Sequence, residues 1–338
     1  MPCPDPNRRA TAAGRVRCLT RGRPGLPRGH TLGAMAEHSA AVRQVVASDG
    51  TRIVYRADGR VGARPLILVH GWAQSSACWG PNVLAALTRQ YRVIAVDLRG
   101  HGYSDAPEDA YDDPSLWAGD LRAVLDAEGI GAGAGAVLLG WSYGGLVCCD
   151  FLDNERGAAA DGTVGGLILV GALTGIGRGQ KGGRVGKAMR AAMPSVLATD
   201  AAVAVPAMIE LTSAFHGEVH GKGEREQALL ALALGTPPRV RTALFNRNSG
   251  HDEMLASLEI PVLVMHGTDD RIVDPSAAEH ALATIPHVRP SFWDGGGHAP
   301  FIENEGRFIS EIDEFIDVLD GDRATAGWGA GSADGGGR

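Results

Sequence analysis

The chain has 338 residues, of which 44% are apolar, 21% charged and 5% aromatic, and its net charge is −7. This apolar content supports a buried core, and the 48 glycines follow no collagen period, so a disordered or fibrous chain is excluded. The acidic body has no basic stripe, which argues against nucleic acid as a partner, and no apolar run reaches the roughly 18 residues of a membrane span.

Both ends of the chain are expected to be disordered. Residues 1–34 are rich in Arg, Pro and Gly, lack the apolar segment of a secretory signal, and show no apolar periodicity. They hold seven Arg and one acid, a net charge of +6, so the rest of the chain carries −13. A transit peptide is the alternative for this segment, although its Pro and Gly would break an amphipathic helix. Residues 321–338 form a Gly-rich tail that is equally short of core-forming residues.

Strand-like and helix-like segments alternate between these ends. Residues 42–59 predict a hairpin with its turn at Ser48-Asp49-Gly50. Short apolar runs, typical of parallel strands buried on both faces, follow at 65–71, 91–100, 136–145, 166–173 and 261–267. Helix-like segments cover 80–90, 114–128, 144–155, 276–284 and 305–319. The alternation predicts a doubly wound α/β sheet.

The alternation is interrupted between residues 173 and 258, where we find no strand-like run. A Gly-rich start is followed by helix-like pieces rich in Ala, Leu and Met. We interpret residues 173–258 as a helical cap inserted between two strands. The core then consists of residues 35–172 and 259–320.

The strongest chemical signal is Gly140-Trp141-Ser142-Tyr143-Gly144-Gly145, which follows a predicted strand and precedes a predicted helix. In that context G-x-S-x-G is a nucleophile elbow. Its turn is so tight that a side chain two residues before or after the serine would collide with backbone. The serine hydroxyl is a weak nucleophile by itself, so a histidine and an orienting acid must lie elsewhere, in the chain order Ser, acid, His.

The predicted base is His298, in the loop Asp294–Pro300 before the last helix, although a surface-loop histidine is the alternative reading. Asp269 and Asp270 both follow the strand at 261–267, at the sheet edge where ligands bind. By position alone, both are candidates for the orienting acid. A tetrahedral intermediate also requires an oxyanion hole. The predicted donors are the backbone N–H groups of Tyr143 and of Trp72, the latter preceded by Gly71.

Five ordered motifs over about residues 40–320 resemble those of the α/β-hydrolase superfamily. They are HGW (70–72), DLRGHGYSD (97–105), GWSYGG (140–145), HGTDDRIV (266–273) and GGGHAPFIEN (295–304). The resemblance implies an eight-stranded, mostly parallel sheet with a cap after strand six. It implies Ser142 as nucleophile, His298 as base, and Asp270 as acid, because the family acid falls three residues after the Gly of HG-x-x-D.

In its motifs the chain looks closest to the cofactor-free haloperoxidase/esterase branch, which implies no cofactor. Two features depart from the common family pattern. Trp141 stands before the serine where His, Phe or Asn is commoner, and Gly171-Ala172-Leu173 offers no alternative acid after strand six. A serine rather than an aspartate nucleophile argues against a dehalogenase or epoxide hydrolase.

These observations predict a serine hydrolase that acts on a small-molecule acyl substrate, an ester or thioester of a small to medium apolar acid. Two alternatives stay open: a perhydrolase in which peroxide replaces water, and a catalytically silent ligand-binding protein. No metal is expected. The five Cys are odd in number and lack metal spacing, so a reduced, cytoplasmic setting fits them best. The physiological substrate and oligomeric state are not encoded in any motif.

Weaker signals have simpler explanations. Gly177-x-Gly179-x-x-Gly182 matches a nucleotide-binding pattern but follows a late strand, so a cap hinge is favoured. His216 and His220 lack a third metal ligand. Five cations at the entry to the cap form either a solvated face or a surface for an anionic substrate: Arg178, Lys181, Arg184, Lys187 and Arg190. Asp97, Arg99 and Ser104 are expected to brace a turn rather than to do chemistry.

Overall fold

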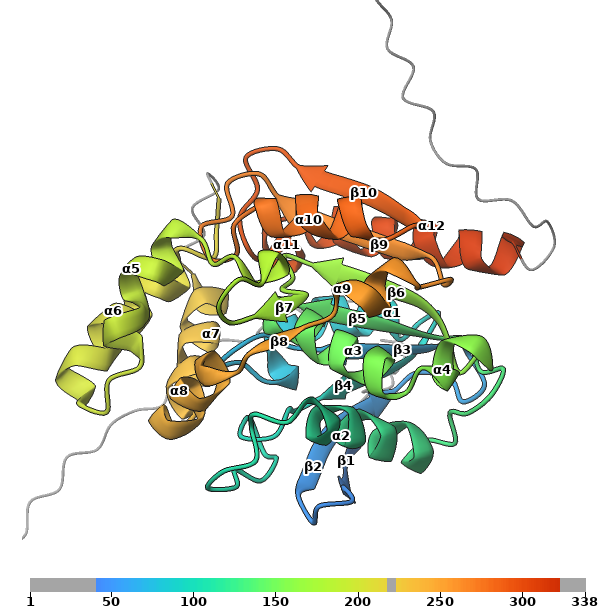
Figure 1. The fold of residues 1–338 in the computed structure, drawn as a ribbon, viewed down its shortest axis with the longest axis horizontal. Helices are drawn as coiled ribbons and strands as arrows, with labels where there is room; N and C mark the ends of the chain where they lie inside the picture. The colour runs from blue at the N-terminus through green and yellow to red at the C-terminus, as the bar shows by residue number, and fades with distance from the viewer. Residues whose placement is uncertain (1–40, 218–222, 323–338) are drawn as a thin grey trace, which may run out of the picture. The chain divides into compact units, whose positions relative to one another are not determined.

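The computed structural model describes residues 41–217 and 223–322, and its centre is an eight-stranded sheet (Figure 1). The spatial order of the strands is β1-β2-β4-β3-β5-β6-β9-β10. Their bounds are β1 Ala41–Val46, β2 Arg52–Asp58, β3 Pro65–Val69, β4 Arg92–Val96, β5 Ala136–Trp141, β6 Val164–Val170, β9 Val262–Gly267 and β10 Val288–Trp293. Strand β2 pairs antiparallel with both of its neighbours, β1 and β4, and every other pair in the sheet is parallel, which confirms the predicted α/β class.

The central strands are buried on both faces, which explains their continuous apolar runs. Every residue of β3 and β5 is buried. The predicted hairpin also forms, and Gly50 supplies the positive φ of 88° that its turn requires. Strand β10 was not predicted, because it lies at the sheet edge, has only one buried residue, and contains Pro290.

Helices cover the sheet, and α1, α2, α3, α10 and α12 fall at the five predicted positions, while the short helices α4, α9 and α11 were not predicted. Helices α2 and α3 contact each other, and α3 packs on β3 and β5, while α1 and α12 form a second contacting pair. The helices of the core are α1 Pro81–Leu87, α2 Pro114–Ala127, α3 Tyr143–Asn154, α4 Gly157–Ala160, α9 Asp252–Ala256, α10 Ser276–Thr284, α11 Pro300–Glu303 and α12 Glu305–Asp322, with a 3₁₀ turn η1 at Ser76–Trp79. Helix α12 extends two residues into the predicted tail 321–338. The rest of that tail and the predicted 1–34 extension lie outside the described residues.

Four helices between β6 and β9 gather on one side of the sheet (Figure 1). They are α5 Lys187–Val196, α6 Ala201–Ser213, α7 Glu224–Gly235 and α8 Pro238–Asn246, preceded by the 3₁₀ turn η2 at Lys181–Gly183. The prediction of no strand here was wrong in one detail: β7 Gly175–Ile176 pairs antiparallel with β8 Ser249–Gly250. Two residues are too few to show a periodicity in sequence. Helix α9 falls within 173–258 but contacts α3 and α10.

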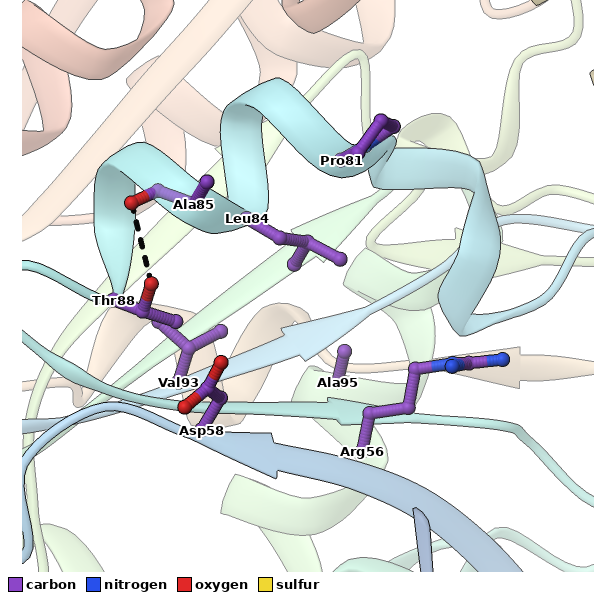
Figure 2. A pocket seen from close by; sticks show the side chains of 8 residues that line it. All are labelled: Arg56, Asp58, Pro81, Leu84, Ala85, Thr88, Val93 and Ala95. Atoms are coloured by element: carbon purple, nitrogen blue, oxygen red, sulfur yellow. Dashed lines mark hydrogen bonds between the residues drawn. The ribbon is translucent and has the colours of Figure 1, made fainter. Parts of the chain in front are cut away.

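A hollow of about 310 Å³ lies between α1 and the sheet, on strands β2 and β4 (Figure 2). Leu84 covers it, Val93 and Ala95 form its floor, and Arg56 and Asp58 stand at its side. None of the predicted site residues lines this hollow. Within the described ranges, no helix is both long and apolar enough to cross a membrane.

Candidate active site

The turn between β5 and α3 holds Ser142 in a strained backbone conformation, with φ 56° and ψ −121°. A Cβ on Gly140 would lie 2.6 Å from the Gly144 carbonyl oxygen, and one on Gly144 would lie 2.1 Å from that of Val69. Only glycine therefore fits two residues before and two after the serine, as predicted. The Ser142 N–H donates to Val170 O at 2.9 Å, which ties the elbow to the end of β6.

His298 and Asp270 are in direct contact at the same edge of the sheet. His298 Nδ1 lies 2.8 Å from Asp270 Oδ2, and both residues are buried. Gly171, directly after β6, lies beside both residues, because a Cβ placed on it would be 3.1 Å from His298 Nδ1 and 3.2 Å from Asp270 Oδ2. The preceding residue, Val170, accepts the hydrogen bond from the Ser142 N–H, so the end of β6 lies between the elbow and this pair. Ser142 follows β5, Asp270 follows β9 and His298 follows β10. Since β5, β6, β9 and β10 are neighbouring parallel strands, the segments after their carboxyl ends bring all three predicted residues to one region.

Asp270 is surrounded by groups that favour its carboxylate. Its Oδ1 accepts hydrogen bonds from the amides of Ile272 and Val273 at 2.8 and 3.0 Å, and His266 Nε2 lies 3.3 Å from its Oδ2. Burial by itself would raise the pKa of Asp270, but His298, His266 and the amide donors outweigh it and hold the pKa below its ordinary value. The carboxylate therefore stays ionised beside the imidazole.

Asp269 has a different environment from its neighbour. Its side chain is 41% exposed and lies 4.0 Å from Lys187 Nζ and 3.7 Å from Arg271 Nε. The structure thus brings Asp270, and not Asp269, to the histidine. Two adjacent aspartates diverge because the turn after β9 directs one carboxylate inward onto backbone amides and leaves the other outside.

The two residues predicted to supply oxyanion donors both lie next to the serine. Tyr143 is the first residue of α3, so its N–H has no helical acceptor. The loop after β3 passes close to the elbow: a Cβ on Gly71 would lie 2.9 Å from Ser142 Cβ, which places the following Trp72 beside the serine. Among the described residues, neither amide donates to a protein acceptor. Both N–H groups are therefore available to an oxygen bound above Ser142.

Several residues that support the histidine loop were not singled out in sequence. The Trp141 indole N–H donates to His298 O at 2.8 Å, which explains the unusual tryptophan before the serine. The segment between β6 and β9 contributes Phe215, whose carbonyl accepts the His298 N–H at 2.8 Å. Glu303 Oε1 accepts from the amides of Gly217 and Gly297, both at 2.9 Å. Only Trp141 had a signal in sequence, as a departure from the family pattern.

The segment after α8 is anchored to α3 by a buried ionic cluster. Arg247 donates to both oxygens of Asp150 at 2.9 and 2.8 Å and to the Tyr143 hydroxyl at 3.0 Å. His251 lies 3.0 Å from Asp150 and 3.1 Å from Asp153. Because Tyr143 is the residue after the serine, this cluster connects the segment after α8 to the elbow.

His251 is expected to make the stability of the protein pH-dependent. Burial by itself would lower its pKa, but Asp150 and Asp153 outweigh burial and raise the pKa above its ordinary value of 6.5. A raised folded-state pKa stabilises the fold below the unfolded-state pKa, and that contribution is lost as pH rises through the folded value. We expect His251→Gln to lower the free energy of unfolding by about 2 kcal/mol near pH 6 and by clearly less near pH 9.

Urea denaturation of both proteins between pH 5 and 9 measures this difference. His280→Gln, which removes a pairing at 2.9 Å between a half-buried histidine and the exposed Asp252, is the matched control and is expected to have a smaller effect at every pH. A difference between wild type and His251→Gln that grows with pH would contradict the assignment.

The weaker sequence signals resolve as follows. The loop-bracing role of Asp97 is confirmed, because its oxygens accept the amides of Ser76 at 2.7 Å and Tyr103 at 3.0 Å. A nucleotide site requires the glycine pattern to lead directly from a strand into an α-helix. The pattern at 177–182 does not do so, since α5 begins only at Lys187. His220 lies outside the described residues, so the proposed metal pair is not tested. The five basic residues at the cap entry are all exposed.

Similarity to known proteins agrees with this geometry. The model of the alpha/beta hydrolase family matches residues 66–311. The crystal structure of the esterase RhEst1 from Rhodococcus sp. ECU1013 is similar with a TM-score of 0.79 and 55% identity, over 82% of this chain and 99% of that one.

Two curated proteins are more distant relatives. A pimeloyl-[acyl-carrier protein] methyl ester esterase of Aliivibrio salmonicida is 29% identical over 75% of this chain and 93% of its own length. A non-heme chloroperoxidase of Streptomyces lividans is 30% identical over 75% of this chain and 92% of its own length. The family match covers most of the chain and contains every predicted site residue. The chain therefore belongs to the alpha/beta hydrolase family and is an esterase-like hydrolase.

Proposed function

We propose that this hydrolase cleaves a carboxylic ester or thioester through an acyl-enzyme on Ser142. The observation that carries the proposal is the 2.8 Å contact between His298 Nδ1 and Asp270 Oδ2 at the edge of the sheet where the strained serine stands. With Nδ1 engaged by the carboxylate, Nε2 is the ring nitrogen that accepts a proton.

The proposed reaction has two halves. Ser142 Oγ attacks the carbonyl carbon while His298 Nε2 takes its proton, and the amides of Trp72 and Tyr143 stabilise the oxyanion. The imidazolium, paired with Asp270, returns the proton to the leaving alcohol or thiol, and the acyl-enzyme remains. Water then attacks the acyl-enzyme with His298 again as base, which releases the acid and restores the serine.

We propose that residues 173–258 act as the cap that excludes water and selects the substrate. Three contacts support this role. The cap carbonyl of Phe215 accepts the His298 amide, that of Leu244 accepts the Tyr143 hydroxyl at 3.3 Å, and that of Arg241 accepts the Trp72 indole N–H at 3.0 Å. The cap thus touches the base and both residues with proposed oxyanion donors.

A fluorophosphonate probe tests the proposal directly. We expect the folded protein to be labelled at Ser142, identified by peptide mass, and to hydrolyse short p-nitrophenyl esters. Prior labelling should abolish that hydrolysis in proportion to the labelled fraction. A folded protein with an unlabelled Ser142 would instead favour the catalytically silent, ligand-binding reading.

A second candidate is perhydrolysis, in which hydrogen peroxide replaces water at the acyl-enzyme and a peracid is released. The similarity to a protein named as a non-heme chloroperoxidase supports it. Halogenation that requires both peroxide and added acetate, and that is lost after fluorophosphonate labelling, would establish it.

We also propose a reducing, cytoplasmic setting for the protein. Three free thiols in the described residues, Cys78, Cys148 and Cys149, are buried, and burial raises their pKa values. Cysteines of this kind pack as apolar side chains and need no disulfide.

A further inference from the structure

A buried arginine in the cap, Arg241 on α8, has two guanidinium nitrogens without partners. The residue is 3% exposed, and its Nε and Nη1 are buried with no hydrogen-bond acceptor in the described part of the chain. Burial lowers its pKa and no neighbouring carboxylate opposes this. An arginine nevertheless stays protonated, so the structure holds an almost fully buried cation that has no described carboxylate beside it.

The comparison with the other buried arginines shows how unusual this is. Arg99 pairs with Asp120 at 2.7 Å, and Arg247 pairs with Asp150 at 2.8 Å. An unpaired buried charge is strongly destabilising, and such groups are retained where function needs them. The positive charge of Arg241 therefore lacks an anionic partner within the described chain, and an anion from outside the chain would stabilise it.

Helix α8 places Arg241 next to the proposed oxyanion site. The Trp72 indole N–H donates to the Arg241 carbonyl oxygen at 3.0 Å. One helical turn further, on the same face, the ring of Phe245 lies 5.4 Å from the ring of Trp72. Because the Trp72 amide is a proposed oxyanion donor, this face of α8 packs on the loop that would hold the reacting carbonyl.

Two further buried polar atoms at the same junction lack partners. Gln74, two residues after Trp72, donates from Nε2 to Leu229 O of α7 at 3.3 Å, but its Oε1 has no donor. Thr236, between α7 and α8, is buried and its Oγ1 is unpaired. Buried polar atoms are nearly always paired. The junction of the loop after β3 with α7 and α8 thus carries three such side chains, as a site for a polar ligand would.

We propose that Arg241 binds a carboxylate of the substrate, so that the preferred substrates are small esters that carry one free carboxylate, an inference that rests on the proposed function of Ser142. A guanidinium binds a carboxylate through two parallel hydrogen bonds, and the attraction between the two charges is stronger where water is excluded. A neutral ester of the same shape would leave the cation unpaired in the complex, which is the strongest form of discrimination available to a pocket.

Two pairs of substrates test the proposal and locate the carboxylate. Monoethyl adipate and its neutral terminal amide place the group on the acyl side. Carboxymethyl butanoate and carbamoylmethyl butanoate place it on the alcohol side. We expect the wild type to prefer the charged member of one pair by at least about tenfold in kcat/KM.

Arg241→Met is expected to lower kcat/KM for that charged ester by at least about 30-fold and to change the neutral ester by less than about threefold. Arg239→Met, which removes a more exposed cation on the same helix, is the matched control and should change neither. The midpoint of thermal unfolding should stay equal or rise in Arg241→Met, because a buried unpaired charge is removed. A structural role would lower it.

Equal losses for charged and neutral esters in Arg241→Met, or a wild-type preference for the amide in both pairs, would overturn the proposal. Calorimetric binding of the same four esters to S142A and to S142A/R241M separates it from the proposed chemistry, since neither protein needs to turn over. If the wild type hydrolyses neither these esters nor short p-nitrophenyl esters, the proposed function fails, and the calorimetric comparison alone decides the role of Arg241. Tighter binding of a charged ester by S142A than by S142A/R241M supports it, and equal binding contradicts it.

Discussion

Ser142→Ala is expected to lower the hydrolysis of short p-nitrophenyl esters by a factor of at least about 10³ while the protein stays folded. The change removes only the attacking oxygen. The backbone bonds that hold the elbow, from Ser142 N–H to Val170 O and from Gly145 N–H to Ser142 O, remain. The amides of Trp72 and Tyr143 also remain, so some stabilisation of the oxyanion is kept and substrate binding should survive.

Steady-state kinetics together with circular dichroism and thermal unfolding measure this result. Ser257→Ala, which removes a hydroxyl bonded only to Met254 O at 2.9 Å in the described structure, is the control and should retain near wild-type activity. Residual turnover by Ser142→Ala above about a thousandth of wild type would remove Ser142 from the proposed role.

Asp270→Asn is expected to reduce kcat by a factor of about 10⁴. The asparagine keeps the shape of the side chain, but its amide no longer offers a carboxylate to His298 Nδ1–H. The ring is then held in the wrong tautomer, and the imidazolium that forms during attack has no counter-charge. Three further contacts of Asp270, to the amides of Ile272 and Val273 and to His266, would be weakened as well.

Asp269→Asn is the matched control, because it makes the same chemical change one residue away. Asp269 is half-exposed and its two ionic contacts are long, so we expect less than about a threefold change in kcat. Kinetics of both variants with one ester, alongside unfolding curves, compare them. A larger loss in Asp269→Asn than in Asp270→Asn would reassign the acid.

The core strands were predictable because strands that are buried on both faces consist of continuous apolar runs. The residues of β3, PLILV, are all buried between two helical layers, and a strand of that kind has to be apolar throughout. Strand β10 has no such apolar run. It lies at the sheet edge, several of its side chains face water, and Pro290 interrupts its pattern, so pairing with β9 alone makes it a strand.

The helical segment between β6 and β9 was predictable as an interruption of the strand–helix alternation, but its attachments to the core were not. Its helices have the expected composition, but the β7–β8 pair at its base is only two residues long in each strand. Arg247 and Arg241 lie six residues apart on the same segment and look alike in sequence. One meets Asp150 and the other meets no described carboxylate, a difference that depends on residues about 100 positions away.

Local steric demands are what the amino-acid sequence by itself determined: the alternation of buried strands and helices, and the glycines that a strained serine turn cannot do without. These steric demands act between residues that are close in sequence, so a short segment is enough to predict them. The HG-x-x-D motif already implied Asp270 rather than Asp269 as the acid. Tertiary structure alone decided that Trp141 supports the histidine loop and that Arg241 is buried unpaired. Each of these depends on which distant side chain arrives at the same point, and no local pattern carries that information.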